Sequence, residues 1–536
     1  MPAEALAAAS AASDARWRPA ANPWAIAVVV TLAAFMEILD STIVNVSLPH
    51  IAGSMSVSYD DATWTLTSYL VANGIVLPIA GWFGRLFGRK RYFVICILAF
   101  TLFSFLCGIA TSLPQLIVFR LLQGFFGGGL QPSQQSIILD TFEPAQRGRA
   151  FSVVAVAVIF APVIGPTFGG WITDTYSWRW VFLINVPVGV FAAIAVTQLV
   201  EDPPWVKRDR ADAKDIDFIG LSLIALGLGS LQVMLDRGED ADWFDSPLIR
   251  LFGVVAAVGL IGAIVWLLLA KRPIVNLRVF ADRNFAVGCL LMFAIGSILY
   301  ATAVLIPQLV QVWYGYTAML AGLVLSPGAL LVLALIPFVA RVLLPNVQTR
   351  FIVAFGFFSL GLALLLAHFL TPTLAFWQVA ALRAAQSFGL AFLFVPNSTL
   401  AYSTLPRALN ADASSLYVLL RNIAGSVGIS LATATLVNRS QMHRAYLVDH
   451  TSPLDAPFNQ MLAAIAQNLQ AHGFAPNIVA STAAGLADKM LDLQAAMLAY
   501  SDIFTYTALA AFAMVPLTLL FRPSRPGVQR ELAAGH

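Results

Sequence analysis

Charged residues are scarce in this sequence. Only 11% of its 536 residues are Asp, Glu, Lys or Arg, whereas 59% are hydrophobic and the mean hydropathy is +0.80. A soluble domain normally carries about a quarter charged residues, so the composition excludes an ordinary soluble protein. The net charge of +3 is too small to indicate a nucleic-acid partner. Repeated apolar runs of about 20 residues, each long enough to cross a bilayer, indicate an all-α polytopic membrane protein.

Motifs for metals, disulfides and enzyme chemistry are also missing. The three cysteines, Cys96, Cys107 and Cys289, lie inside apolar runs, so neither a disulfide framework nor a metal site is indicated. The six histidines lack metal-ligand spacing, and no G-x-x-x-x-G-K-[ST] loop or nucleophile elbow occurs. An ATP-driven pump and a membrane enzyme are therefore disfavoured, and no cofactor is expected.

Apolar windows long enough to span a membrane recur fourteen times along the chain. They lie near 24–46, 63–83, 92–111, 114–135, 150–172, 180–200, 217–235, 248–269, 285–307, 318–340, 351–370, 375–397, 413–437 and 502–521. If the N-terminus is cytoplasmic, 22 of the 31 Lys and Arg residues fall in cytoplasmic segments. Because cytoplasmic loops retain basic residues, we expect both termini inside the cell.

The predicted organisation of the chain follows these spans. It comprises a cytoplasmic tail (1–23), an N-terminal six-helix bundle (24–200), a charged, Pro-broken cytoplasmic linker (201–216), two inserted helices and a loop (217–284), a C-terminal six-helix bundle (285–521) and a second cytoplasmic tail (522–536). The first tail lacks the basic start and short apolar core of a signal peptide. Within the last bundle, residues 438–501 are expected to form short amphipathic helices outside the membrane. These helices either pack on the rest of the chain or dock a partner protein.

A faint internal repeat relates the two predicted bundles. The segment "RLLQGFFGG" at 120–128 is echoed by "RAAQSFGLA" at 383–391, and both carry Arg-x-x-Gln on a predicted span. Pro132 and Pro396 follow the two arginines at similar distances. Two related halves of six spans are a common construction of transporters.

Two carboxylates lie well inside a predicted span. They are Glu37 and Asp40 in "FMEILDSTIVNVSLP", residues 35–49. An Asp at the centre of a membrane helix costs roughly 2.5–3.5 kcal/mol, and proton relays are a standard use of such residues. Poor solvation and mutual repulsion favour a bound proton on at least one of the pair. We therefore predict proton coupling, with Arg120 as the counter-charge of Asp40. The alternatives are a purely structural Asp40–Arg120 pair and a Glu37 near a helix end.

Glycine and proline patterns predict two places where helices pack closely. In "APVIGPTFGGWI", 161–172, Gly165, Pro166, Gly169 and Gly170 favour a kinked helix in close backbone contact, or ordinary small-residue packing. In "GWFGRLFGRKR", 81–91, the residues Gly81, Gly88 and Arg89 are expected to form a tight basic turn against neighbouring helices.

Taken together, these motifs resemble the major facilitator superfamily. "LDSTIVNVSLP" (39–49), "RLLQGFFGG" (120–128) and "GPTFGG" (165–170) are similar to signatures of its fourteen-span drug/proton antiporters. "SLQVMLDRGEDADWF" (230–244) and "LVNRSQMHRA" (436–445) resemble the EmrB/QacA subfamily, especially its EmrB-type branch. Nearly the whole chain, roughly 24–521, shares this resemblance.

The resemblance implies a fold and a mode of action. The fold is two six-helix bundles around a central cavity with two inserted helices, in the bacterial inner membrane. Alternating access would be driven by proton entry at Asp40 and Arg120, with the glycine motif of 165–170 in the antiporter signature. EmrB-type members resemble the inner-membrane part of a tripartite pump, so a periplasmic membrane-fusion adaptor and an outer-membrane channel are expected as partners. One departure is Arg85, which stands where the signature of the second-to-third loop usually has an acid.

The substrate prediction is an amphipathic organic compound in a largely apolar, aromatic cavity. Candidate polar residues, each of which could instead make a helix–helix hydrogen bond, are Tyr69, Asn73, Gln123, Tyr300, Gln308, Gln311 and Asn397. Two further arginines in spans, Arg383 and Arg421, either bond unwound carbonyls or face the cavity. The rival functions are export of one specific metabolite or lipid, and a membrane sensor or scaffold with a transporter fold.

Overall fold

Helices form almost all of the part of the chain that the computed structural model describes. The structure describes residues 19–204, 217–271, 273–369, 371, 374–406, 409–449, 451 and 455–523. Most of the predicted tails 1–23 and 522–536, and most of the linker 201–216, lie outside the described residues. The helices are α2 (Pro23–Met55), α3 (Tyr59–Phe87), α4 (Arg89–Gly108), α5 (Leu113–Gly127), α6 (Leu130–Thr141), α7 (Pro144–Thr175), α8 (Trp180–Leu183), α9 (Asn185–Leu199), α10 (Phe218–Arg237), α11 (Pro247–Leu269), α12 (Arg283–Val312), α13 (Ala318–Phe338), α14 (Leu344–Asn346), α15 (Thr349–Leu366), α16 (Phe376–Ala391), α17 (Phe394–Ala401), α18 (Asn410–Val448), α19 (Ala456–Ala471) and α20 (Pro476–Leu517).

Local sequence sets where many of these helices begin. The side chains of Asn22, Ser58, Asp282 and Thr317 each accept a hydrogen bond from a backbone N–H in the first turn of α2, α3, α12 and α13, respectively. Such N-caps satisfy backbone donors that have no partner within the helix. The apolar runs then continue each helix far enough to cross a bilayer.

The membrane-spanning segments agree with the predicted fold. Among the described residues, twelve helical segments are long and apolar enough to span a membrane, and α7 qualifies as a thirteenth span bent by 46°. The remaining predicted span consists of α5 and α6, each of which is too short to qualify alone. They follow one another along α4, and the break between them lies at Gly128 and Gly129.

Glycine is required where this break passes neighbouring helices. A Cβ atom at Gly128 would lie 2.8 Å from the backbone oxygen of Asn73, and one at Gly129 would lie 2.5 Å from Tyr92 Oη. Both separations are too short for a carbon atom. The close approach of α3 and α4 to the break between α5 and α6 therefore depends on the absence of side chains at Gly128 and Gly129.

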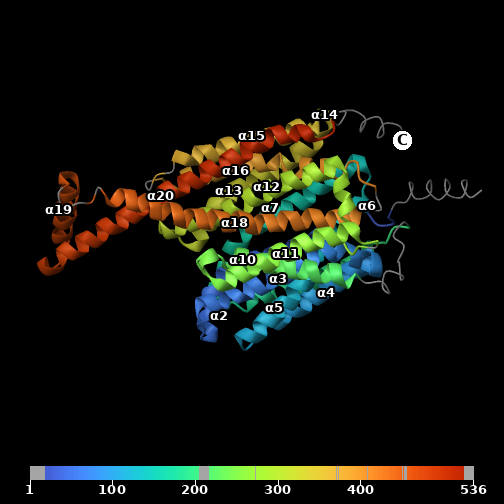
Figure 1. Ribbon diagram of the computed structural model, residues 1–536, viewed down its shortest axis with the longest axis horizontal. Helices are drawn as coiled ribbons and strands as arrows, with labels where there is room; N and C mark the ends of the chain where they lie inside the picture. The colour runs from blue at the N-terminus through green and yellow to red at the C-terminus, as the bar shows by residue number, and fades with distance from the viewer. Residues whose placement is uncertain are drawn as a thin grey trace, which may run out of the picture.

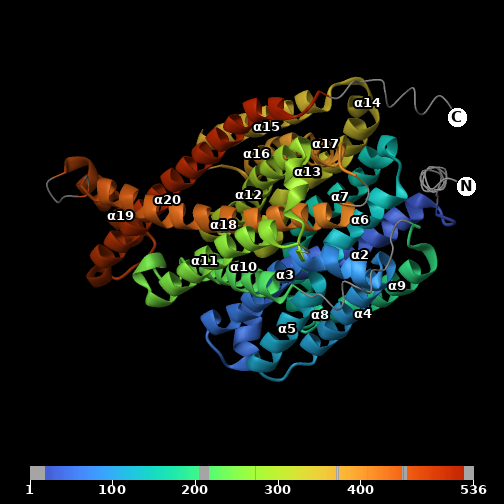
Figure 2. The same ribbon diagram turned by 45° about the vertical axis from the view of Figure 1, so that its right-hand side comes forward.

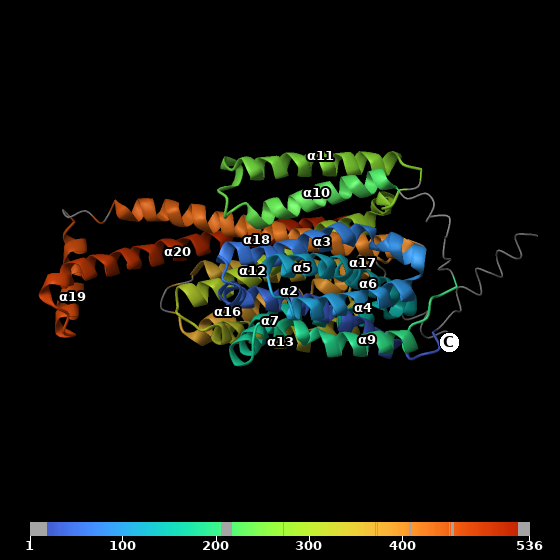
Figure 3. The same cartoon turned by 90° about the horizontal axis from the view of Figure 1, so that it is seen from below.

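Equivalent helices pack in the same order in the two halves of the chain. In the first half α2 packs on α7, α5 on α3 and α4, and α4 on α9. In the second half α12 packs on α18, α16 on α13 and α15, and α15 on α20. The halves meet where α7 contacts α13 and α17, and where α18 contacts α3 and α6. The α10–α11 pair lies outside both, with α10 against α3 and α18 (Figure 3).

Two helices extend far beyond the others at one end of the molecule. α18 has 39 residues and α20 has 42, so at 1.5 Å per residue they measure about 58 and 63 Å, roughly twice the thickness of the hydrocarbon core. Their projecting ends carry α19 (Figure 1). The segment 438–501, expected to form short helices, therefore consists of α19 and the continuous extensions of two spans.

The first and last described residues lie at the opposite end from α19 (Figure 2). We refer to this opposite end as the terminal end and to the end with α19 as the hairpin end. The backbone N–H of Arg522 donates to Asn284 Oδ1 at the start of α12, which fixes the last helix at the terminal end.

Candidate functional site

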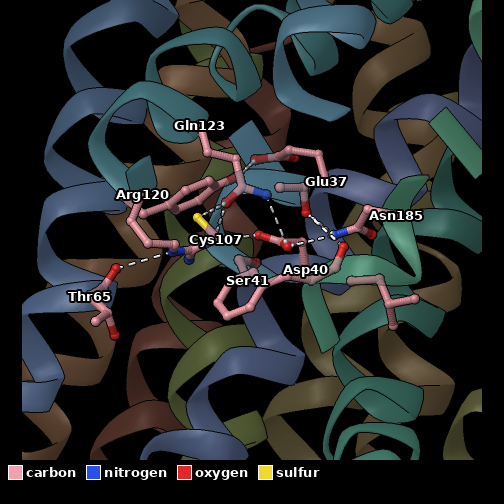
Figure 4. A network of polar contacts seen from close by, with 12 residues as sticks. Glu37, Asp40, Ser41, Thr65, Cys107, Arg120, Gln123 and Asn185 are labelled. Atoms are coloured by element: carbon pink, nitrogen blue, oxygen red, sulfur yellow. Dashed lines mark hydrogen bonds and ion pairs between the residues drawn. The ribbon is translucent and has the colours of Figure 1, made fainter. Parts of the chain in front are cut away.

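A buried ion pair lies in the middle of the first half. Asp40 on α2 and Arg120 on α5 are both fully buried, and Arg120 Nη1 donates to Asp40 Oδ2 over 2.6 Å (Figure 4). Arg120 Nε also donates to the backbone oxygen of Thr65 over 3.2 Å. The guanidinium carbon lies 4.1 Å from the centre of the Tyr69 ring, which adds a cation–π contact. The structure thus brings together the two residues that the sequence selected, 80 positions apart.

Two amide side chains complete the surroundings of the Asp40 carboxylate. Gln123 Nε2 donates to Asp40 Oδ1 over 3.2 Å while its oxygen accepts from Arg120 Nη1 over 2.9 Å. Asn185, at the start of α9, donates to the same Asp40 oxygen over 2.7 Å and to Ser104 Oγ over 3.0 Å. Donors from α5 and α9 therefore stabilise the ionised carboxylate, and they tie α2 to both helices.

Glu37 belongs to a second network that crosses between the halves. It is 3% exposed, and Tyr69 Oη and Asn73 Nδ2 donate to its Oε1 over 2.9 and 3.0 Å. Gln131 Nε2 on α6 donates to Glu37 Oε2, and Gln131 Oε1 accepts from Arg421 Nη2 on α18. One glutamine thus joins a carboxylate of the first half to an arginine of the second. A position near a helix end is not observed, because Glu37 lies well within α2.

The glycine-rich part of α7 packs beside Asp40. A Cβ atom at Gly165 would lie 2.1 Å from Thr42 Oγ1, and one at Gly169 would lie 2.9 Å from Ile43 Cγ2. At Gly170 the nearest atom would be 3.8 Å away, which is ordinary contact. The predicted kink is present near Pro162, and Pro166 lies in the segment that follows the bend. Gly165 and Gly169 therefore set the spacing between α7 and the turn of α2 that follows Asp40.

Charged residues connect the two halves at the terminal end. Gly88 has φ = 87° between α3 and α4, a conformation that favours glycine. Arg89, 7% exposed, pairs with Asp140 on α6 of the same half, and Asp140 Oδ1 accepts from Asn410 Nδ2 at the start of α18 over 3.2 Å. Arg85 on α3 pairs with Asp412 at the start of α18. A Cβ atom at Gly81 would lie 3.0 Å from Asp412 Oδ1, so α3 approaches α18 closely here.

The unusual Arg85 is thereby explained. Where the signature that this segment resembles has an acid, this chain has Arg85 in the last turn of α3, and the acidic partner of Arg85 is Asp412 on the opposing helix α18.

A small central cavity lies between the halves and has room for about one water molecule. It is lined by Gln135, Phe151, Val154, Ala155, Val158, Met292, Phe394, Ser398, Tyr417 and Arg421. This lining is mostly apolar with a few polar groups, and the cavity is too small for an organic ligand in this conformation. None of the seven residues predicted from sequence to bind substrate is part of it.

Those seven residues make other contacts. Tyr69, Asn73 and Gln123 hold the two carboxylates, as described above. Asn397 is fully buried and donates to the backbone oxygen of Gly288 over 2.9 Å and to Tyr417 Oη over 3.0 Å.

The last three lie on α12. The Tyr300 ring packs close to Gly425 of α18, Gln308 is half-buried, and the exposed Gln311 donates to its own helix at Pro307.

Sequence reasoning missed several residues of these networks. Asn185 and Gln131 are neutral, and amides in apolar runs are common enough that nothing singled them out. The sequence marks Arg421 as a charge within a span, but its partner Gln131 is 290 residues away. Asp412 gives no signal in the sequence because it lies at a helix start, where an acid has a local explanation.

Comparisons with known proteins support the same assignment. The Major Facilitator Superfamily profile matches residues 30–429. The chain belongs to this superfamily. It is 36% identical over 497 residues to the multidrug export protein EmrB of Escherichia coli K12, which covers 92% of this chain and 94% of the relative. It is also 33% identical over 506 residues to the fatty acid resistance protein FarB of Neisseria gonorrhoeae, covering 94% and 97% of the two chains.

A solved structure supports the fold independently. A double tryptophan mutant of XylE aligns with a TM-score of 0.56 over 96% of this chain and 98% of that one, at 15% identity. The superfamily membership and the apolar helices together identify the chain as a multi-pass inner-membrane transporter and not an enzyme.

Proposed function

We propose that the chain is a proton-driven antiporter that exports amphipathic drugs or toxic organic compounds across the bacterial inner membrane. The single observation that carries this proposal is the fully buried Asp40 carboxylate, paired with Arg120 inside a span. A carboxylate at this depth carries a large desolvation cost. Residues that bear this cost commonly serve a function such as proton transfer. With the positive-inside rule, the terminal end faces the cytoplasm and the hairpin end faces the periplasm.

Protonation of Asp40 would change how three helices are held together. The ionised carboxylate accepts bonds from Arg120, Gln123 and Asn185. A proton removes the charge, and hydrogen bonds to a charged group are worth about 1.5–3 kcal/mol each. Such a change is large enough to shift a conformational equilibrium by tenfold or more.

The change at Asp40 can reach the other half through α7. The Gly165 and Gly169 contacts hold α7 against the turn of α2 that follows Asp40. The same helix contacts α13 and α17 in the second half. A shift of α2 relative to α5 and α9 would therefore move an element at the interface, as alternating access requires.

Glu37 is proposed as a second proton-coupling group. Its link through Gln131 to Arg421 exists only while Glu37 accepts a hydrogen bond from the amide. A proton on Glu37 would weaken this connection between halves, beside the central cavity that Arg421 lines. Proton binding and opening of the cavity would then favour one another.

Gating at the terminal end is proposed for the ion pairs and the close helix contacts there. Arg85 with Asp412 would hold the cytoplasmic side closed in this conformation. Asp140, which pairs with Arg89 inside the first half, would contribute through the hydrogen bond that it accepts from Asn410 of α18. The central cavity is too small for an organic substrate, so these contacts must separate, or the hairpin end must open, before substrate binds.

The hairpin end is proposed to dock a periplasmic adaptor that leads to an outer-membrane channel. The projecting parts of α18 and α20 expose Tyr446, Ile478, Leu486 and Met490, each at least 39% accessible. Lys substitutions at Leu486 and Met490 are expected to abolish crosslinking to a co-expressed adaptor without changing proton-coupled transport in liposomes. Unchanged crosslinking would contradict docking at this face.

The narrower alternative is export of one metabolite or lipid, which the name of the FarB relative favours. A competition panel of unrelated amphipathic compounds separates the two: broad export predicts mutual competition, whereas a narrow exporter responds to one chemical class. A sensor or scaffold would move no solute under an imposed proton gradient.

The decisive experiment measures substrate-dependent proton movement in proteoliposomes for the wild type and Asp40→Asn. We expect proton movement to be lost in the variant while the protein remains folded. Ser41→Ala is the matched control, because Ser41 Oγ bonds only to the backbone oxygen of Ile38 among its described partners. Normal coupling in Asp40→Asn would refute the role of Asp40 and leave Glu37 to be tested by Glu37→Gln.

A further inference from the structure

Arg383 on α16 is a buried cation without an acidic partner. The residue is 3% exposed. Its Nη1 donates to Thr302 Oγ1 over 2.9 Å and to Gln386 Oε1 over 3.3 Å. Within the described residues, no carboxylate forms an ion pair with it, and its Nε has no hydrogen-bond partner.

The first half shows what is missing at this position. Arg120 and Gln123 on α5 correspond to Arg383 and Gln386 on α16, since both pairs come from the repeated Arg-x-x-Gln. In each pair the arginine Nη1 donates to the glutamine oxygen. The third partner differs, because Asp40 on the first helix of one half is replaced by Thr302 on the first helix of the other.

The charges inside the membrane do not balance as a result. Asp40 neutralises Arg120, and Glu37 lies one glutamine away from Arg421. The other buried charges of the described residues, such as Arg89 and Asp412, are at the terminal end of their helices. One positive charge in the middle of the spans, that of Arg383, is left over. An isolated buried charge is highly unfavourable unless it is paired.

The free groups around Arg383 are hydrogen-bond donors. Gln386 Nε2 is buried and has no partner, like Arg383 Nε. The amide orientation is fixed because the Gln386 oxygen accepts from Arg383. Two unpaired donors and an excess positive charge select a ligand that is negatively charged and accepts hydrogen bonds.

The packing beside Arg383 limits the size of such a ligand. A Cβ atom at Gly328 on α13 would lie 2.4 Å from Ser387 Oγ and 3.2 Å from the backbone oxygen of Arg383. α13 therefore packs directly on this turn of α16, which excludes a large ligand.

We propose that Arg383 and Gln386 form a binding site for one small monovalent anion in the second half, in the place that the Asp40 carboxylate occupies in the first. The anion is a halide from the medium or the carboxylate of a small organic acid, since both present one negative charge and accept hydrogen bonds. It neutralises the charge of Arg383 and accepts hydrogen bonds from the two unpaired donors, Arg383 Nε and Gln386 Nε2.

The test uses the purified full-length protein in detergent and follows its thermal unfolding. Chloride or acetate replaces the bulky anion isethionate at constant ionic strength. We expect a saturable rise in Tm with one or both small anions, because a ligand that binds only the folded state stabilises it. A rise with chloride identifies a halide site, and a rise with acetate alone identifies a carboxylate site.

Substitutions at Thr302 locate the effect. Thr302→Asp supplies the missing carboxylate to Arg383 and is expected to abolish the anion dependence, with a higher Tm in isethionate. Thr302→Asn introduces a side chain of the same size as Asp but without its charge, and this variant should keep the anion response. Arg383→Gln should weaken anion binding by about 10- to 150-fold, since hydrogen bonds to a charged group are worth about 1.5–3 kcal/mol.

Two results would overturn the proposal. One is a wild-type Tm that is the same in chloride, acetate and isethionate. The other is a Thr302→Asp variant that folds and retains the full anion response. Neither measurement involves transport, so the outcome is independent of whether protons are exchanged at Asp40.

Discussion

The Arg85–Asp412 pair allows a quantitative test of how the terminal end is held closed. Arg85→Gln, Asp412→Asn and the double variant form a double-mutant cycle. The Arg85 side chain is 31% exposed and that of Asp412 is 5% exposed. Exposed pairs contribute about 0–1 kcal/mol, whereas breaking a buried pair costs about 3–5 kcal/mol. For this half-exposed pair we expect a coupling energy of about 1–3 kcal/mol, which changes the ratio of closed to open molecules by about 5- to 150-fold.

The assay is a distance distribution between spin labels on the two halves. Phe87→Cys and Val347→Cys place labels at the terminal end, at positions that are 43% and 38% exposed. The native residues Cys96, Cys107 and Cys289 are buried, so labelling is selective. Each single variant should increase the population with a long distance.

Non-additivity is the decisive feature of the cycle. The double variant should open the terminal end little more than either single variant, because both remove the same interaction. Arg91→Gln is the control, since Arg91 is exposed in the first turn of α4, close to Arg85 in sequence, and should leave the distribution unchanged. Additive effects of the two substitutions, or none at all from Asp412→Asn, would refute a closing role for this pair.

Three further substitutions, one of them a control, test the interior contacts. Gly165→Leu should lower the free energy of unfolding by about 1–3 kcal/mol, the usual cost of overpacking, because even a Cβ atom there would lie 2.1 Å from Thr42 Oγ1. Gly170→Ala should change the free energy of unfolding little, since its Cβ atom would be 3.8 Å from the nearest atom. Equal losses of stability in the Gly165 and Gly170 variants, measured by chemical denaturation, would contradict the packing argument. Gln131→Leu should cost about 1–3 kcal/mol by leaving Glu37 and Arg421 without their common partner and should abolish transport in liposomes. Transport at the wild-type rate would show that this connection is dispensable.

The sequence by itself determined the class of the protein. Apolar runs interrupted by loops fix the spans, because each must match the thickness of a bilayer. The scarcity of charge in those runs made Asp40 and Arg120 conspicuous, since either residue alone would be costly in lipid. The glycines of 165–170 likewise predicted close packing, which depends on the absence of a side chain and on little else.

The tertiary structure alone decided which residues complete each network. Gln131 meets Arg421, and Arg85 meets Asp412, across the interface between two halves that lie hundreds of residues apart in sequence. Periodicity along one helix says which face is apolar, but it does not say which residue of another helix will lie opposite. Thr302 illustrates the same limit, because a threonine in an apolar run is unremarkable until the packing of α12 against α16 places it beside an unpaired arginine. The partners of a buried charge depend on distance in space, and only the packed helices define that distance.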